Sequence, residues 1–181
     1  MTRAAPYQLL VMGVAGCGKS TLAAELARAL GCPLIEGDDH HPARNQEKMR
    51  QGIALDDADR APWLSQLGDL LAAGNDGAVL TCSALKRRYR DQLRAVVPSL
   101  AIVFIDITPA QARARVSARA AHLFPASLVD SQFEVLESPL GEPGVLRVEA
   151  AQPVAAQLDA ILRWLDHHAS QTPHPIKENL S

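Results

Sequence analysis

The sequence is poor in cysteine and has no long apolar run, and each absence excludes a class of protein. The three cysteines, Cys17, Cys32 and Cys82, are odd in number and widely spaced, so they fit neither a disulfide framework nor a metal-binding pattern. Reduced thiols and a cytoplasmic location are therefore expected. No apolar segment approaches the roughly 20 residues that span a bilayer, and residues 1–7 hold no apolar signal core. No membrane partner is expected.

Net charge is also nearly absent. Lys and Arg number 18 against 20 Asp and Glu, which leaves a net charge of −2 and no electrostatic reason to bind nucleic acid. With 48% apolar and 21% charged residues, the composition is that of a soluble globular protein. The 181 residues suit one domain over residues 1–168. The tail over 169–181 contains two prolines and is expected to be disordered.

The strongest positive signal is the segment G-V-A-G-C-G-K-S-T at residues 13–21, which fits G-x-x-x-x-G-K-[ST] at every fixed position. An apolar run precedes it and a helix-like run follows, which is the strand–loop–helix context that a phosphate-binding loop requires. Lys19 is expected to reach the β- and γ-phosphates, and the Ser20 hydroxyl to bind Mg²⁺. The residues predicted to bind ATP are Gly13, Val14, Ala15, Gly16, Cys17, Gly18, Lys19, Ser20 and Thr21.

Alternating apolar and amphipathic segments indicate an α/β fold. Strands are predicted at residues 9–12, 33–37, 78–82, 101–105 and 145–148. Helix-like segments between them imply right-handed crossovers, and hence five parallel strands flanked by helices in the three-layer fold of P-loop NTPases. A ligand should then bind at the carboxyl ends of the strands.

The reaction class follows from what accompanies the loop. The D-x-x-G and N-K-x-D motifs of GTPases are not found, and a motor or transporter ATPase would need a longer chain, which leaves a small phosphoryl-transfer kinase. Asp38 directly follows the second predicted strand, where a carboxylate could take the proton of an acceptor hydroxyl. Asp38 or Asp39 could instead cap the next helix. The base is favoured for Asp38 and the cap for Asp39.

Several basic residues could meet an anionic substrate. Arg60 lies in an acidic run, where a structural ion pair is an equal alternative. Lys86 and Arg90 lie one turn apart at the start of a predicted helix, where the helix dipole disfavours cations. That cost suggests that they face an anion, whereas Arg87 and Arg88 are assigned to the solvated surface.

Two arginines, one histidine and two tryptophans complete the candidates. Arg115 and Arg119 lie four residues apart on one helix face, before an irregular stretch, and could close over the triphosphate. A solvated helix face is the alternative. His122 could contact substrate or cap the helix break. Trp63 and Trp164 are assigned to the core because both lie in apolar helical patterns.

These residues resemble the P-loop gluconokinases, in particular the thermoresistant type. The similarity extends from Leu9 to Pro139. Beyond the P-loop and E-G-D at 36–38, its most specific stretches are C-S-A-L-K-x-x-Y-R-D at 82–91 and S-Q-F-x-x-L-E-x-P at 131–139. The chain departs from the family pattern at 119–124, which lacks the basic residue and glycine usually found after the arginine.

The resemblance implies ATP-dependent phosphorylation of D-gluconate at its terminal hydroxyl by a Mg²⁺-using homodimer, with a fold like nucleoside monophosphate and shikimate kinases. It implies a substrate-binding segment at about 38–75 and a lid at about 115–140. Catalytic roles fall to Lys19, Asp38 and Arg119. Substrate contacts are implied for Asp38, His41, Arg60, Lys86, Arg90 and His122.

The residues alone indicate phosphoryl transfer to a small anionic acceptor, and only the resemblance specifies gluconate. A kinase of another acid, such as shikimate or another aldonate, remains an alternative. So does a nucleotide-binding regulator without transfer activity, although an intact Lys19, Ser20 and Asp38 argue against it.

Overall fold

The structure, a computed structural model, describes residues 7–118 and 127–169. At its centre is a five-stranded sheet in the order β2-β3-β1-β4-β5, with every neighbouring pair parallel. The strands are β1 (Gln8–Met12), β2 (Leu34–Glu36), β3 (Ala78–Thr81), β4 (Ala101–Asp106) and β5 (Val145–Glu149). The five predicted parallel strands are confirmed, with ends that differ from the predictions by at most one residue.

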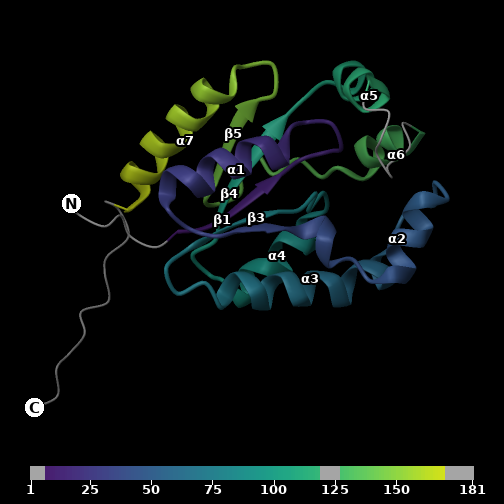
Figure 1. Cartoon of the computed structure of the whole chain (residues 1–181), viewed down its shortest axis with the longest axis horizontal. Helices are drawn as coiled ribbons and strands as arrows, with labels where there is room; N and C mark the ends of the chain where they lie inside the picture. Colours follow the sequence, from purple (N-terminus) through teal and green to yellow (C-terminus); the bar gives the residue numbers. More distant parts are fainter. Residues whose placement is uncertain (1–6, 119–126, 170–181) are drawn as a thin grey trace, which may run out of the picture.

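Helices cover both faces of this sheet, as Figure 1 shows. They are α1 (Lys19–Leu30), α2 (Ala43–Arg50), α3 (Asp57–Ala72), α4 (Arg87–Val96), α5 (Pro109–Ala118), α6 (Ser127–Val135) and α7 (Val154–Ala169), with a 3₁₀ turn, η1, at Gly37–His40. Helices α1 and α7 pack on one face and α3 and α4 on the other, while α2, α5 and α6 lie toward one end of the molecule (Figure 1).

The core consists of two apolar layers, one on each side of the sheet. Successive side chains of a strand point to opposite faces, so Leu9 and Val11 pack toward α1 and α7 while Leu10 and Met12 pack toward α3 and α4. All four are fully buried. A strand covered on both faces is apolar throughout rather than alternating, which is why these strands were recognisable from continuous apolar runs.

Helix ends follow local chemistry. Gly31 ends α1 in the left-handed region at φ 65°, a conformation that glycine adopts readily and that often ends helices. Asp56 begins α3 with a capping box, in which the Asp56 side chain accepts from Asp59 N at 2.8 Å and the Asp59 carboxylate accepts from Asp56 N at 3.1 Å.

Helix α2 was not among the predicted elements, and its sequence, A-R-N-Q-E-K-M-R, is almost entirely polar. Its attachment to the rest of the molecule is ionic rather than apolar. Lys48 Nζ lies 2.7 Å and an Arg44 nitrogen 3.2 Å from the buried Asp59 carboxylate. The hydrogen bond from Lys48 and the nearby charges hold the pKa of Asp59 below its usual value. A helix fastened in this way lacks the apolar periodicity by which helices are recognised.

Within the described ranges, no helix is long and apolar enough to cross a membrane.

Candidate active site

The phosphate-binding loop connects β1 to α1. Gly13 and Gly18 adopt φ 147° and φ 102°, values that favour glycine. A Cβ on Gly13 would lie 2.8 Å from Cys17 Sγ and 2.9 Å from Ile105 O, so a side chain there would also clash. Gly18 precedes the first turn of α1 without a side-chain cap, which leaves backbone N–H groups and the positive end of the helix dipole for an anion.

Lys19 and Ser20 project from the first turn of α1. The Lys19 ammonium donates to the carbonyls of Gly13 and Val14, at 3.0 Å each, and therefore lies along the start of the loop. The Ser20 hydroxyl donates to Glu36 Oε2 at 3.1 Å, and Thr81 Oγ1 donates to the same oxygen at 2.6 Å. Glu36 had received no role from the sequence, although an acidic residue closing an apolar strand was a usable signal.

A cavity of about 290 Å³ opens beside this loop. Its walls come from the P-loop, η1, the α2–α3 connection, the β3–α4 connection, α5 and α6. Of the predicted site residues, the cavity brings together Ala15, Gly16, Gly18, Lys19, Ser20, Thr21, Asp38, His41, Arg60 and Lys86. Residues from separate parts of the sequence thus converge at the carboxyl ends of the strands, as the fold predicts.

Asp38 lies in this cavity beside a buried histidine. Its side chain is 82% exposed, and Oδ1 lies 3.8 Å from Nε2 of His41. The His41 ring stacks on Trp63 with centroids 3.9 Å apart, and the Trp63 indole donates to Gly37 O at 2.9 Å. Trp63 is in the core, as predicted, and also lines the cavity.

His41 is neutral at pH 7. Burial lowers its pKa to about 4, with Arg60 acting in the same direction and Asp38 opposing. Asn45 Nδ2 lies 3.5 Å from His41 Nδ1; because an amide nitrogen is a donor, this contact favours the tautomer with hydrogen on Nε2, facing Asp38. A neutral neighbour leaves the exposed carboxylate of Asp38 free to accept a proton.

Two cations line the same cavity as the P-loop. Lys86 Nζ pairs with Asp57 Oδ1 at 3.1 Å and is 26% exposed. Arg60 donates through Nε to Leu55 O at 3.3 Å. Both cations lie 5.7 Å from the ring centre of Tyr89, a distance that permits a cation–π attraction. The arrangement suits an acceptor with a negative charge at one end.

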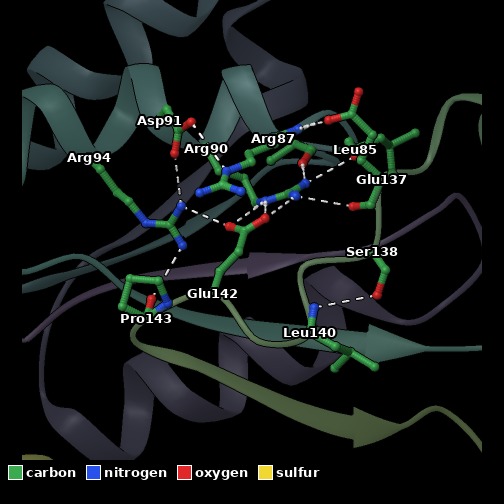
Figure 2. Close-up of polar contacts among 11 residues, drawn as sticks. Leu85, Arg87, Arg90, Asp91, Arg94, Glu137, Ser138, Leu140, Glu142 and Pro143 are labelled. Atoms are coloured by element: carbon green, nitrogen blue, oxygen red, sulfur yellow. Dashed lines mark hydrogen bonds and ion pairs between the residues drawn. The ribbon is translucent and has the colours of Figure 1, made fainter.

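Arg90, which the sequence also assigned to the substrate, does not belong to the residues that line the cavity. Figure 2 shows its guanidinium between Leu85 and Glu137 on one side and Glu142 on the other. The side chain is 0% exposed and donates to Ala84 O at 2.9 Å, Leu85 O at 3.0 Å, Glu137 O at 3.1 Å and the Glu142 carboxylate. Its position therefore contradicts a direct contact with a ligand in the cavity. Arg90 lies one helical turn from Lys86, as the spacing indicates, but its charge is paired with Glu142 inside the fold.

Of two polar side chains on α5 and α6, Gln132 lines the cavity and Arg115 does not. Arg115 donates to Ala150 O at 2.8 Å and lies 3.4 Å from the carbonyls of Gly16 and Cys17, so it rests against the P-loop. Gln132 of α6, which had received no role, accepts from Ala15 N at 2.6 Å. Arg119 and His122 lie outside the described residues.

Comparisons with known proteins agree with this geometry. The sequence model of the AAA domain family matches residues 9–139. A gluconokinase of Gluconobacter oxydans (strain 621H) is 45% identical over 161 residues, covering 87% of this chain and 90% of the relative. The thermoresistant gluconokinase of Escherichia coli (strain K12) is 40% identical over 149 residues, covering 80% of this chain and 85% of the relative.

Solved structures show the same likeness in three dimensions. A gluconokinase from Sinorhizobium meliloti 1021 has a TM-score of 0.84 at 41% identity, covering 94% of this chain and 99% of that one. Shikimate kinase from Aquifex aeolicus vf5 has a TM-score of 0.59 at 20% identity, covering 91% and 99%, and shares the fold alone. The predicted fold class and the resemblance drawn from the sequence are both confirmed: the chain belongs to the gluconokinase family.

Proposed function

We propose that this protein transfers the γ-phosphoryl group of ATP to the terminal hydroxyl of D-gluconate, giving 6-phospho-D-gluconate and ADP. The relatives named above are gluconokinases. The observation that carries the proposal is a cavity lined by the P-loop lysine, Lys19, together with an exposed carboxylate, Asp38, and two cations, Arg60 and Lys86. In such a reaction Lys19 would act on the phosphates of ATP, and Asp38, Arg60 and Lys86 on the acceptor.

Asp38 is the proposed base. Its carboxylate accepts the proton of the acceptor hydroxyl while the hydroxyl oxygen forms a bond to the γ-phosphorus. The bond from that phosphorus to the oxygen shared with the β-phosphate breaks, and ADP leaves. Lys19 stabilises the negative charge on the phosphates during this transfer. The neutral His41 borders the carboxylate without forming a competing ion pair with it.

Lys86 and Arg60 are proposed to hold the carboxylate end of the sugar acid. Both residues line the same cavity as the P-loop. Binding one end of a six-carbon acid there leaves the other end directed toward the phosphates. Shikimate and other aldonates also carry a carboxylate, so length and hydroxyl pattern must select among them.

Mg²⁺ is the proposed metal, and the residues beside the P-loop fit it. Mg²⁺ prefers oxygen ligands and is usually held by one or two protein groups together with substrate phosphates. The Ser20 hydroxyl and the Glu36 carboxylate share a hydrogen bond at 3.1 Å and provide such oxygens. Among the described residues, no group of three His, Cys, Asp or Glu side chains could hold a metal alone. When bound, the ion would neutralise charge on the β- and γ-phosphates.

The remaining features rest on the family resemblance. Arg119 and His122 are proposed as residues of a lid over about 115–140, and residues 38–75 as the segment that binds the sugar acid. A homodimer is proposed on the same ground. The free Cys17, Cys32 and Cys82 favour a reducing compartment, and hence the cytoplasm.

The test is Mg²⁺-dependent ADP release from ATP with D-gluconate, shikimate, other aldonates and nucleoside monophosphates as separate acceptors. Release with gluconate, abolished in Lys19→Ala, is the expected result. Release with a different acceptor would retain the mechanism and refute the substrate. ATP binding without release for any acceptor would favour a regulator.

A further inference from the structure

One peptide group of the P-loop is held from both sides. The carbonyl of Val14 accepts from the Lys19 ammonium at 3.0 Å, and the N–H of Ala15 donates to Gln132 Oε1 at 2.6 Å. These two atoms belong to the same planar peptide, in which C=O and N–H point in opposite directions. The lysine and the glutamine therefore determine its orientation together.

This orientation is not imposed by the loop itself. Glycines flank the Val14–Ala15 pair, and Gly13 and Gly16 adopt φ 147° and φ 80°. Such residues allow a neighbouring peptide to rotate more readily than a chain of ordinary residues would. A rotated peptide would turn the Val14 carbonyl away from Lys19 and remove one of the two carbonyls on which the ammonium rests.

The hydrogen bond from Ala15 N–H to Gln132 opposes that rotation. The side chain of Gln132 is only 8% exposed. Gln132 belongs to α6 and lies 117 positions after Ala15 in the sequence. Because the Ala15 N–H is a donor, the atom that meets it must be the amide oxygen of Gln132, so the side-chain orientation follows from chemistry.

We propose that Gln132 is a positioning residue for phosphoryl transfer, which holds the Val14–Ala15 peptide so that its carbonyl faces Lys19. The inference rests on the proposed function, because it assigns Gln132 an effect on the lysine that contacts the phosphates. It also couples α6 to the P-loop, so that the lysine is set in place only when α6 is docked.

The kinetic test compares two variants of nearly equal side-chain length. Gln132→Met cannot accept a hydrogen bond, and its kcat is expected to fall by roughly tenfold or more, because the Val14–Ala15 peptide can then rotate away from Lys19. Its KM for gluconate should change less than twofold, because the acceptor groups are untouched. Gln132→Glu keeps an acceptor oxygen, and should restore kcat to within about threefold of wild type while raising the KM for ATP by charge repulsion.

A matched control separates positioning from general stability. Gln157 of α7 is also a buried glutamine, 4% exposed, and donates to the carbonyls of Glu149 at 2.9 Å and Gln152 at 3.0 Å. Gln157→Met should lower the melting temperature with kcat unchanged. An unchanged kcat in Gln132→Met, or an equal loss in both methionine variants, would overturn the proposal.

A second readout does not depend on turnover. Hydrogen exchange at the Ala15 amide, followed by NMR on the full chain, should be at least about tenfold faster in Gln132→Met than in wild type. Gln132→Glu should remain protected. Unchanged exchange of the Ala15 amide in Gln132→Met would contradict the proposal that Gln132 holds the Val14–Ala15 peptide, even if the enzyme is active. If wild type phosphorylates no acceptor, the proposed function fails while this experiment still decides whether Gln132 holds the loop.

Discussion

The replacement of Arg90 by methionine distinguishes a substrate ligand from an internal clamp. The sequence placed Arg90 with Lys86 at the acceptor, whereas the structure buries it completely against Glu142, whose side chain is 7% exposed. The Arg90→Met variant keeps much of the apolar volume and removes the charge and every donor. It leaves three backbone carbonyls without the bonds described above and Glu142 with Arg94 alone, at 2.8 Å.

The expected cost is large because the pair is buried. Removing one partner of a buried ion pair typically destabilises a protein by about 3 to 5 kcal/mol. At about 2 to 4 °C per kcal/mol for a domain of this size, the melting temperature should fall by roughly 10 °C. Arg94 is 17% exposed and bonds to the same carboxylate, which would still be paired with Arg90 after its removal, so Arg94→Met should cost less than Arg90→Met.

The assay is thermal denaturation paired with steady-state kinetics at a temperature where each variant is folded. Arg90→Met should melt far below Arg94→Met while its KM for gluconate stays within about threefold of wild type. The double variant Arg90→Met/Glu142→Met, which removes both charges, should recover at least half of the lost stability.

One result would refute this reasoning. A melting temperature within about 2 °C of wild type, together with a tenfold rise in the KM for gluconate, would mean that the Arg90 guanidinium reaches the substrate. The structural role given to Arg90 would then be wrong, and its assignment to the substrate from the sequence would be correct.

Three further predictions concern the cavity. Asp38→Asn should abolish most turnover while ATP affinity, measured by calorimetry, stays within about threefold; normal turnover would remove Asp38 as the base. Glu36→Gln should raise the Mg²⁺ concentration needed for half-maximal rate, because the Ser20 hydroxyl loses its charged partner at 3.1 Å; an unchanged requirement would place the metal elsewhere. For His41, the folded pKa of about 4 lies below the unfolded value near 6.5. Between these values the unfolded chain binds more protons, so stability should fall by roughly 2 to 3 kcal/mol as pH drops from about 6.5 to 4. Denaturant titrations of wild type and His41→Gln over that range should differ in slope, and parallel curves would contradict the buried neutral histidine.

The arrangement of the site follows from sheet topology. Parallel strands end at one edge, so the P-loop after β1, Asp38 after β2 and Lys86 after β3 meet at one cavity although they are far apart in sequence. Predicting the strands was therefore enough to predict that these three residues converge. The same argument does not extend to side chains that bond across the fold.

Local patterns determined most of what the sequence alone could establish. The strands are continuous apolar runs, and the P-loop is a contiguous motif. Gly31 favours the C-terminal end of a helix and Asp56 the N-terminal end. Each of these features can be recognised within a few residues of sequence. Helix α2 escaped because its attachment through Asp59 is ionic.

Only the tertiary structure decided which polar side chains face the cavity and which serve the fold. Arg90 meets Glu142 across 52 positions, Gln132 meets Ala15 across 117, and Glu36 meets Thr81 across 45. A motif specifies that an arginine or a glutamine is present, but the partner that satisfies it is set by packing between distant elements. A charge that is completely buried and paired, such as that of Arg90, is not available to a ligand, because a buried charge without its partner is too costly to persist.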